Sequence, residues 1–480
     1  LESCFCEFRA SDFLELRTKF KAMCLFCIDQ FIPNWRVKPT KHTPWMNRRT
    51  IQLKRKAKRF RKKGATAVNL TTVRTALSES IAEAKKFYFS NTLHNFIRED
   101  PQKFRNFIRD HNKSITSITH DGTVITDPKS IADLLNAHFH SVFSSPTQPY
   151  FQISRSSFSD INIFQQGVLN MLLRLKTKSS VGPDSIPNSF LWRYTEPLRK
   201  FLVAIFQASL ESAILPPDWK IASIVPILKR GDPSSVLNYR PTSILSSCKM
   251  IEHIVSDYII NFLNEHDNLT PFQHGFRKGL STITQLSMVI YSFASVLDRG
   301  GQIVVIFLDF QNAFDVVPHD KLICKLQFLG FSSFILSWIS AYLTHRKQCV
   351  IIDEQQSDSF PVTSGVPQGS VLGPLLFLIY CNDITDVIQA PVNIPLFADD
   401  CIIFNEISAV ENRFLLSATL NSIFKWSNKW GMKLNYSKSV LLRLTKKTVP
   451  LKFSYSIGQD PLIEVKEYKY LGLTITNNLN

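Results

Sequence analysis

Apolar and polar positions follow different patterns along the chain, and the change falls near residue 161. From there onward, stretches with helical spacing alternate with short apolar runs. This mixture predicts an α+β domain with a small sheet and helices on one of its faces. The predicted strands are Ile221–Leu228 and Ile303–Leu308. The predicted helices span residues 188–213, 249–264, 281–298 and 319–343.

The first 160 residues are organised differently. Apolar residues recur at helical spacing from Ala65 to Ile97, which predicts one long amphipathic helix that Pro101 ends. Residues 144–160 are rich in serine, with proline and glutamine, which is typical of a linker. Residues 36–63 contain 13 Lys or Arg and no Asp or Glu. We expect this run to bind phosphate, although a nuclear-localisation signal would have the same composition.

Composition narrows the class of protein. Of the 480 residues, 44% are apolar, which is enough for several packed domains. The net charge of +17 indicates an anionic partner, either nucleic acid or an anionic membrane. No apolar run is long enough to span a bilayer and the first residues do not resemble a signal peptide, so we expect a soluble protein with reduced cysteines.

Four of the nine cysteines lie close together near the start of the chain. Cys4 and Cys6 form a Cys-x-Cys spacing, and Cys24 and Cys27 form a Cys-x-x-Cys spacing. Such spacings occur in zinc sites. Their neighbours here are Phe, Leu and Met, and no second tight ligand pair follows. This pattern favours buried apolar positions on a helix face over a zinc site.

Acidic residues stand at the ends of apolar runs in two places. Asp309 directly follows Ile303–Leu308, a run of β-branched and aromatic residues typical of a buried strand. Ninety residues later, Asp399 and Asp400 stand between two apolar runs, as at the tip of a β-hairpin. An isolated Asp-Asp pair more often marks a turn or a cap. Together, however, the three acids predict a site for hard divalent cations, two of which would clamp a phosphoryl transfer.

A series of motifs, in order, resembles the non-LTR (LINE-type) branch of the reverse-transcriptase family over about residues 175–475. The motifs are Trp219–Asp232, Asn238–Pro241, Gln273–Arg277 with Ser281 and Thr282, Leu308–Asp315 with Pro318–Asp320, Gly365–Pro374, Phe397–Asp400, Gly431–Lys438 and Tyr468–Leu473. Short motifs occur by chance, but this order and spacing make coincidence very rare.

The resemblance implies the fingers and palm of a right-hand polymerase, an α+β fold with a small antiparallel palm sheet. A basic, mainly helical N-terminal region would precede them, and the thumb would be largely missing. The implied boundaries are an uncertain segment at 1–35, the basic region at 36–143, a linker at 144–160, fingers at 161–300, a palm with primer grip at 301–475, and the start of a thumb at 476–480.

The resemblance also implies the catalytic residues. Asp309 and Asp399 would coordinate two Mg²⁺ ions, with Mn²⁺ as an alternative, and Asp400 would complete the metal site. Lys438 would protonate the departing pyrophosphate. Lys229 and Arg240 would grip the incoming triphosphate, although both would also suit the surface of a hairpin.

Further residues would hold the substrates. Phe314 would lie beneath the sugar of the incoming nucleotide, although most Phe residues are simply core residues. Gln368, with a donor and an acceptor, would contact the nucleotide, and Gly365 and Gly369 would leave room beside a base pair. The residues implied to contact template or primer are Arg277, Gly369, Leu471 and Gly472.

The implied function is RNA-directed DNA synthesis, in which RNA is copied into DNA from a DNA 3′ hydroxyl. The partners would be an RNA template, a DNA primer or target and dNTPs, with no membrane, in a ribonucleoprotein of nucleus and cytoplasm. The oligomeric state is open. A maturase-type reverse transcriptase is the nearest enzymatic alternative. The alternative from another class is a catalytically inactive, RNA-binding remnant of such an element.

Overall fold

The computed structural model describes residues 13–32, 46–62, 67–87, 115–145, 161–177, 181–229, 231–244 and 249–479. The chain forms two compact units, the smaller spanning Ile32–Thr116 and the larger combining Leu1–Phe31 with Ser117–Asn480. The boundary therefore lies before the end of the predicted basic region at 143, because residues from 117 onward pack with the larger unit. Each unit is described by itself below.

Among its described residues, the smaller unit contains a pair of helices, α3 (Arg48–Lys62) and α4 (Ala67–Phe87). Asn47 caps α3, since its Oδ1 accepts from the Thr50 N–H at 2.9 Å. The buried Thr50 hydroxyl lies 2.9 Å from the Ser80 hydroxyl of α4 and joins the two helices. The predicted helix over Ala65–Ile97 is confirmed for Ala67–Phe87, and its remaining part and Pro101 lie outside the described residues.

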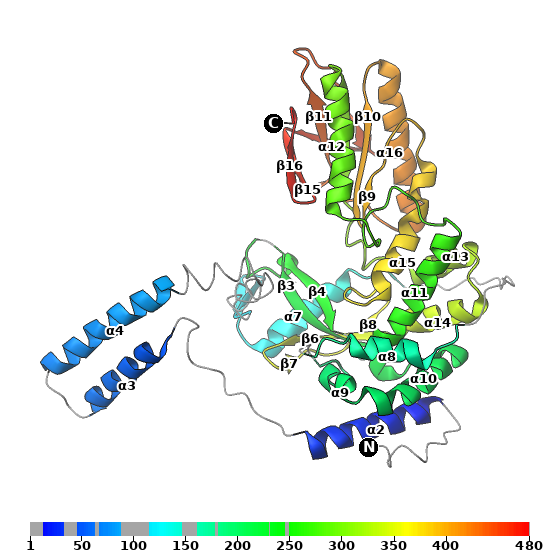
Figure 1. The fold of residues 1–480 in the computed structure, drawn as a ribbon. Coiled ribbons are helices and arrows are strands. Elements are labelled where there is room, and N and C mark those ends of the chain that lie inside the picture. Colours follow the sequence, from blue (N-terminus) through cyan, green and yellow to red (C-terminus); the bar gives the residue numbers. More distant parts are fainter. Residues whose placement is uncertain are drawn as a thin grey trace. The chain divides into compact units, whose positions relative to one another are not determined.

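Short strands and longer helices make up the larger unit, a mixed α and β fold (Figure 1). The helices are α2 (Phe13–Phe31), α7 (Pro128–Ser141), α8 (Gln165–Leu173), α9 (Asn188–Arg193), α10 (Thr195–Ser212), α11 (Lys249–Glu265), α12 (Thr282–Asp298), α13 (His319–Phe328), α14 (Ser333–Leu343), α15 (Leu372–Cys381) and α16 (Val410–Trp430). Short 3-10 helices are η2 (Pro217–Trp219), η3 (Val236–Asn238) and η4 (Asn382–Val387).

Within the described residues, the strands of the larger unit fall into two five-stranded sheets and three isolated pairs. They are β1 (Ile118–His120), β2 (Thr123–Ile125), β3 (Ile221–Leu228), β4 (Tyr239–Ile244), β5 (Gln302–Leu308), β6 (Arg346–Ile352), β7 (Gln355–Gln356), β8 (Phe360–Val362), β9 (Leu396–Phe397), β10 (Asp400–Glu406), β11 (Val440–Thr445), β12 (Ser456–Ile457), β13 (Asp460–Pro461), β14 (Ile463–Val465), β15 (Glu467–Tyr470) and β16 (Leu473–Thr476).

The central sheet has the strand order β14-β11-β5-β10-β9. Its middle strand, β5, is buried along all seven residues and pairs antiparallel with β10 and β11. Each buried Val, Ile, Phe or Leu there contributes roughly 1.5–3 kcal/mol through removal from water. The predicted antiparallel sheet needs one correction, because the edge strand β14 runs parallel to β11.

Helices cover both faces of the central sheet rather than the one face predicted. On one face, Ile303, Val305 and Phe307 of β5 pack in a common core with Val289 and Phe293 of α12. The alternate β5 residues are buried as well, and α16 packs against β10 (Figure 1). A strand buried on both faces is a continuous apolar run, which explains why β5 shows no alternation in the sequence.

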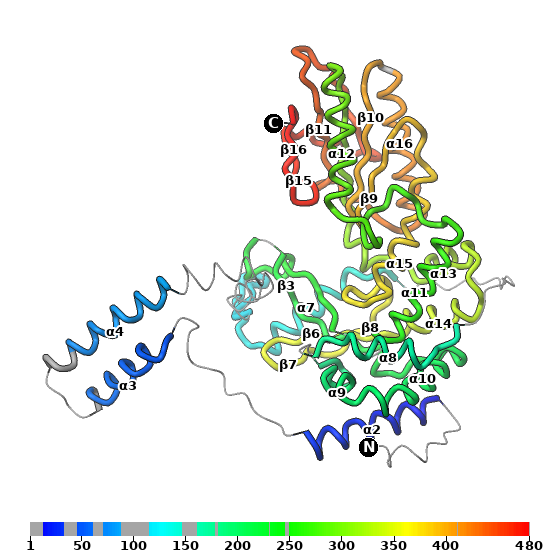
Figure 2. Tube along the Cα trace, in the orientation of Figure 1, coloured from blue at the N-terminus to red at the C-terminus, as the bar shows by residue number. Residues whose placement is uncertain are grey.

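The second sheet has the order β4-β3-β6-β7, with β8 also paired to β6. Strands β3 and β4 form an antiparallel hairpin in which Ile227 lies opposite Arg240. The far end of β3 is exposed at Val225, Ile227 and Leu228. Figure 2 shows this hairpin on a different part of the larger unit from the central sheet.

Most predicted elements are confirmed, with two interruptions. The strand Ile221–Leu228 has the predicted bounds, and the helices predicted at 249–264 and 281–298 are α11 and α12. The region 188–213 is two helices that meet at Tyr194. The region 319–343 is also two helices, because Gly330 adopts a φ of +91° between α13 and α14.

The described N-terminal cysteines are core residues of a helix. Cys24 and Cys27 are buried in α2, as predicted, whereas Cys4 and Cys6 lie outside the described residues. Within the described ranges no helix has both the length and the apolar character needed to cross a bilayer.

Candidate active site

Strand register brings the predicted acids together. In the antiparallel pair of β5 and β10, Leu308 lies opposite Cys401. Asp309 follows β5 and Asp400 precedes Cys401, so these two acids stand at the same end of neighbouring strands. Asp399 occupies the adjoining turn between β9 and β10. The β-hairpin predicted from the sequence is therefore confirmed, with Asp399 at its tip.

The turn of this hairpin has two residues. Phe397 pairs with Asp400, so Ala398 and Asp399 alone connect β9 to β10. Ala398 adopts a φ of +55°, in the left-handed region that residues with a Cβ seldom occupy. Such a conformation persists only where surrounding contacts hold it.

Burial raises the pKa of all three acids, and neighbouring acids raise it further for Asp309 and Asp400. Burial raises the pKa of Asp309, and the neighbouring Asp399 raises it further, while Lys438 lowers it. Burial also raises the pKa of Asp399. The pKa of Asp400 is raised to about 6 by burial and by the charges of Asp399 and Asp309. Protons or cations must therefore relieve the repulsion between these carboxylates.

The donor set fits a hard divalent cation. The three side chains offer only carboxylate oxygens, the ligands that Mg²⁺ and Mn²⁺ prefer. In the part of the chain that the structure describes, no three His, Cys, Asp or Glu side chains are close enough together to form a complete metal cage. Mg²⁺ sites commonly use one or two carboxylates together with substrate phosphates, so such a cage is not needed.

The loop before β11 surrounds Asp309. Lys438 Nζ lies 3.8 Å from Asp309 Oδ2. The Asp309 N–H donates to Ser439 Oγ at 3.2 Å, and the Asn435 N–H donates to the Asp309 carbonyl at 2.7 Å. A hydrogen bond from the Asn435 side chain also lowers the pKa of Asp309. Asn435 and Ser439 were not predicted from the sequence, although they lie in or beside the motif Gly431–Lys438.

Lys229 and Arg240 belong to the same electrostatic neighbourhood. Lys229 directly follows β3, and its N–H donates to the Asn238 carbonyl at 2.7 Å, beside Arg240 on β4. Partial burial lowers the pKa of Lys229, as do Arg240 and Lys438, while Asp315 and Asp309 raise it. Both cations in turn lower the pKa of Asp399. The predicted cations therefore lower the pKa of one predicted acid, Asp399, and another predicted acid, Asp309, raises the pKa of Lys229.

Phe314 lies half-buried on an aromatic stack. Its ring stacks on Phe377 with centroids 4.2 Å apart and an interplanar angle of 17°. Phe276 meets it edge-on at 6.2 Å. Phe377 belongs to α15 and is fully buried, so it supports one face of the Phe314 ring. This half-exposed position suits either a substrate contact or packing, and both interpretations from the sequence stay open.

Gln368 is held by a fourth carboxylate. Its Nε2 donates to Asp315 Oδ1 at 2.8 Å. Burial raises the pKa of Asp315 to about 6, while the hydrogen bond from Gln368 and the charges of Lys229 and Arg240 lower it. Asp315 is the last residue of the motif Leu308–Asp315, but no role was predicted for it from the sequence.

Gly365 and Gly369 make room for the protein's own backbone. A Cβ on Gly365, where φ is +85°, would lie 2.7 Å from the Asp315 Cα, and one on Gly369, where φ is +98°, would lie 2.7 Å from the Ser243 carbonyl oxygen. Both glycines therefore let neighbouring backbone approach closely, and room for that backbone beside a base pair stays a prediction. Contact of Gly369 with template or primer remains a prediction.

The remaining predicted contacts lie in two turns. Arg277 Nη1 donates to the Thr270 carbonyl at 2.8 Å and so closes the loop before α12. Leu471 and Gly472 form the two-residue turn between β15 and β16, with φ values of +47° and +94°. Positive φ at both positions is the pattern of a type I′ hairpin turn.

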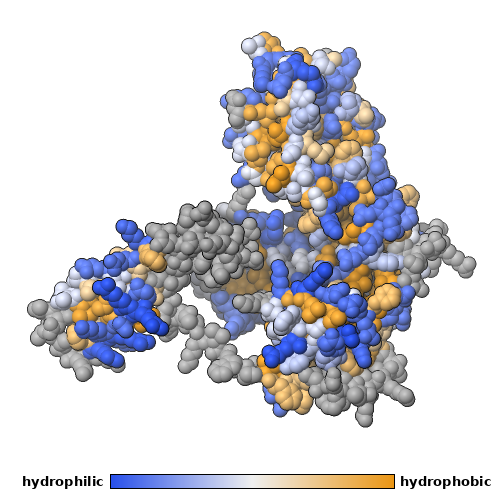
Figure 3. All heavy atoms as spheres, in the orientation of Figure 1, coloured by the Kyte–Doolittle hydropathy of each residue, from blue (hydrophilic) through white to orange (hydrophobic). Residues whose placement is uncertain are grey.

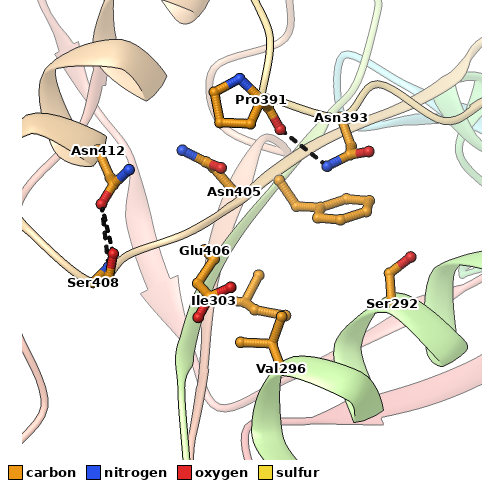
Figure 4. Close-up of a pocket in the computed structure, with 10 residues that line it drawn as sticks. Ser292, Val296, Ile303, Pro391, Asn393, Asn405, Glu406, Ser408 and Asn412 are labelled. Carbon is orange, nitrogen blue, oxygen red and sulfur yellow. Dashed lines mark hydrogen bonds between the residues drawn. The ribbon is translucent and has the colours of Figure 1, made fainter. Parts of the chain in front are cut away.

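A cavity of about 330 Å³ lies elsewhere, at the far end of β10 (Figure 4). Val296 of α12 and Glu406, Ser408 and Asn412 line it. Glu406 is six residues along β10 from Asp400, which is roughly 20 Å at strand spacing. This cavity is therefore separate from the acids.

The family of this chain is shown by comparison with known proteins. Residues 227–475, more than half of the chain, match the family described as reverse transcriptase (RNA-dependent DNA polymerase). The chain therefore belongs to the reverse-transcriptase family, as its motifs predicted.

Its relatives include proteins of mobile elements. The RNA-directed DNA polymerase from mobile element jockey of Drosophila melanogaster is 30% identical over 326 residues, covering 65% of this chain and 35% of that protein. The putative 115 kDa protein in type-1 retrotransposable element R1DM of the same species is 26% identical over 374 residues, covering 75% and 34%. These matches confirm the predicted non-LTR branch. The chain spans about a third of the length of these relatives.

A solved structure of apo telomerase from Candida tropicalis is also similar, at 15% identity and a TM-score of 0.38, covering 56% of this chain and 55% of that chain. A likeness at this level carries no argument about function.

Proposed function

We propose that this chain is an RNA-directed DNA polymerase that transfers nucleotides with two divalent cations. The observation that carries the proposal is the register that puts Asp309 and Asp400 at adjoining strand ends beside Asp399. Lys229 and Arg240 interact electrostatically with these acids, as phosphate-binding residues next to a metal site would.

Each group has a distinct part in the proposed reaction, in which the primer 3′ hydroxyl attacks the α-phosphate in line. Asp309 and Asp399 would bind two Mg²⁺ ions, which activate the attacking hydroxyl and neutralise the developing charge. Lys229 and Arg240 would hold the triphosphate, one as a point charge and the other as a planar fork. Lys438, whose side chain is 69% exposed near Asp309, would donate a proton to the leaving pyrophosphate.

In this proposal the two sheets serve as parts of a polymerase hand. The central sheet is the palm, the β3–β4 hairpin belongs to the fingers, and the β15–β16 hairpin is the primer grip. Leu471 of that hairpin packs against the core cluster that also contains Phe307, so the grip would be fixed relative to Asp309. Arg277, Gln368 and Gly369 would contact template, primer or nucleotide.

The basic helix α3 is our candidate for RNA contact. Lys54, Arg55, Lys58 and Arg59 are exposed, and hydrophilic side chains are prominent on this unit (Figure 3). Cations that neutralise RNA phosphates release counterions, so replacing these four by Gln is expected to weaken RNA binding and flatten its salt dependence. An unchanged slope of log affinity against log salt would assign α3 to another role.

Primer extension tests the proposed activity directly. The chain is incubated with poly(rA)/oligo(dT), dTTP and Mg²⁺ or Mn²⁺, and incorporation is compared with that of Asp399→Asn. Incorporation that the variant loses supports the proposal. RNA binding without incorporation, also when the chain is extended by its flanking sequence, would instead support an inactive remnant.

A further inference from the structure

The segment Phe272–Gly275 lies beside the β9–β10 hairpin, which it contacts through an isolated β-bridge. Gln273 bridges Leu396 of β9 in parallel register. The Leu396 N–H donates to the Phe272 carbonyl, and the His274 N–H donates to the Leu396 carbonyl, both at 2.9 Å. Since β9 is the last strand of the central sheet, this segment covers its edge next to the turn that carries Asp399.

The Gln273 side chain continues this pairing around the turn. Its Oε1 accepts from the Ala398 N–H and from the Gly275 N–H, both at 2.8 Å. Its Nε2 donates to the Ala398 carbonyl at 3.4 Å. Gln273 is only 4% exposed, so its amide has little water to bond to instead. One side chain therefore binds both backbone groups of the left-handed residue that precedes Asp399.

Gly275 allows this close contact. A Cβ at Gly275 would lie 2.3 Å from the Ala398 nitrogen, closer than atoms that are not bonded can come. Gly275 itself does not have a positive φ, so alanine there would strain only the contacts with the hairpin and with Gln273 Oε1, which would lie 3.0 Å from the new Cβ. The two chain segments are thus in direct backbone contact at the turn.

We infer that Gln273 is a positioning residue, which holds the Ala398–Asp399 turn so that Asp399 and Asp400 face Asp309 in a geometry suited to divalent cations. This inference rests on the proposed function. The need for such a clamp follows from two features of the turn. Ala398 has a backbone conformation that requires support, and the three carboxylates repel one another before cations bind. Residues that orient metal ligands typically affect affinity or activity 10–100-fold.

The chain contains a matched control for Gln273. Gln302, at the start of β5, binds the backbone of Leu451 in the same way, with Oε1 accepting from the Leu451 N–H at 2.9 Å and Nε2 donating to its carbonyl at 2.8 Å. Gln302 is also fully buried. It lies at the opposite end of β5 from Asp309, so it shares the bonding pattern but not the site.

The test replaces each glutamine by methionine, which has a similar size but no amide. Mn²⁺ affinity of the full chain is measured by electron paramagnetic resonance, and Mg²⁺ activation is measured by primer extension. Gln273→Met is expected to weaken Mn²⁺ binding about tenfold and to raise the Mg²⁺ concentration for half-maximal activity, with RNA affinity unchanged. Gln302→Met is expected to lower the melting temperature while leaving Mn²⁺ affinity at the wild-type value.

A second pair of variants applies if Gln273→Met does not fold. Gly275→Ala forces the segment and the hairpin apart and is expected to weaken Mn²⁺ binding in the same direction. Gly167→Ala in α8 is its control, because a Cβ there meets nothing within 4 Å. Wild-type Mn²⁺ affinity in folded Gln273→Met or Gly275→Ala overturns the inference, as does a wild-type chain that binds no Mn²⁺. A wild-type chain that binds Mn²⁺ but incorporates no dNTP overturns only the proposed activity.

Discussion

The two five-stranded sheets of the larger unit carry opposite charges in opposite surroundings. Asp309 follows β5, which is buried along its whole length, Asp399 directly precedes the largely buried β10, and burial raises the pKa of both acids. The cations of the second sheet, Lys229 and Arg240, extend from a hairpin whose apolar residues Val225 and Ile227 are themselves exposed. A rigid, buried support can fix carboxylates at the spacing that cations require, whereas an exposed hairpin can reach toward a mobile triphosphate.

The energetic consequences differ as well. Ionised carboxylates at a buried strand end destabilise the fold until a cation or proton neutralises them. Exposed cations cost little in the free protein, and each hydrogen bond they make to a charged phosphate contributes about 1.5–3 kcal/mol. We therefore expect substitutions on the central sheet to affect activity more than substitutions on the hairpin.

The largest effect is expected for Asp399→Asn. It removes a charge that would hold a cation at the reacting phosphate, so incorporation should fall by about 10³-fold or more, with RNA affinity nearly unchanged. Asp309→Asn should do the same. Asp353→Asn, in an exposed turn between β6 and β7, is the control for the change in charge. Wild-type incorporation by Asp399→Asn in Mg²⁺ would remove the basis of the two-metal proposal.

A smaller loss is expected on the cationic hairpin. Lys229→Ala or Arg240→Ala should lower kcat/KM for dNTP by about 10–100-fold, the value of one or two hydrogen bonds to phosphate. The matched control is Lys347→Ala, because Lys347 is exposed on β6 opposite Ile221, at the other end of the same sheet. Steady-state kinetics at several dNTP concentrations make the comparison. Equal losses in all three variants would show a general charge effect instead of triphosphate binding.

Phe314 follows Asp309 by five residues and tests sugar selection. A ring beneath the nucleotide would collide with a ribose 2′ hydroxyl but not with deoxyribose, so Phe314→Val should raise the rNTP/dNTP ratio of kcat/KM about tenfold. Phe314→Ala should raise it more but leaves a larger gap over Phe377 and so risks destabilisation. The ratio cancels losses from misfolded enzyme. A folded variant with the wild-type ratio would identify Phe314 as a packing residue.

The sequence predicted best those features that a local pattern encodes. The apolar run before Asp309 and the two apolar runs around Asp399 and Asp400 predicted a strand and a hairpin, and both are present. The break in the helix predicted at 319–343 was missed, because apolar spacing on both sides of Gly330 continues the same period. Coverage of both faces of the central sheet was also missed, although the uninterrupted apolar run of β5 is typical of it.

Contacts between distant segments could not be predicted in this way. Gln273 and Ala398 are 125 positions apart, and nothing in either local pattern indicates that an amide of one binds the backbone of the other. The close contacts of Gly365 with Asp315 and of Gly369 with Ser243 are of the same kind. In each case the sequence shows a glycine or glutamine in a motif, and only the fold shows which backbone it touches.

The smallest expected effect is on the thermal stability of the protein and concerns Asp315, whose pKa is affected by Lys229 and Arg240 of the hairpin. Burial raises the pKa of Asp315 to about 6, above the ordinary value of 3.8, although Lys229 and Arg240 oppose the shift. The folded state therefore binds the proton more tightly than the unfolded state. The stability that this proton provides is complete below about pH 4, falls as the pH rises toward 6, and is absent above it.

Asp315→Asn keeps an acceptor for Gln368 Nε2 but carries no charge, so it should melt about 2–4 °C higher than wild type at pH 8 and at nearly the same temperature at pH 4. Thermal unfolding followed by circular dichroism at pH 4, 5, 6, 7 and 8 measures this difference. In a Lys229→Ala background one opposing charge is gone, so the difference at pH 8 should grow. A difference that does not change with pH, or one that shrinks in the Lys229→Ala background, would mean that Asp315 is not coupled to the cationic hairpin.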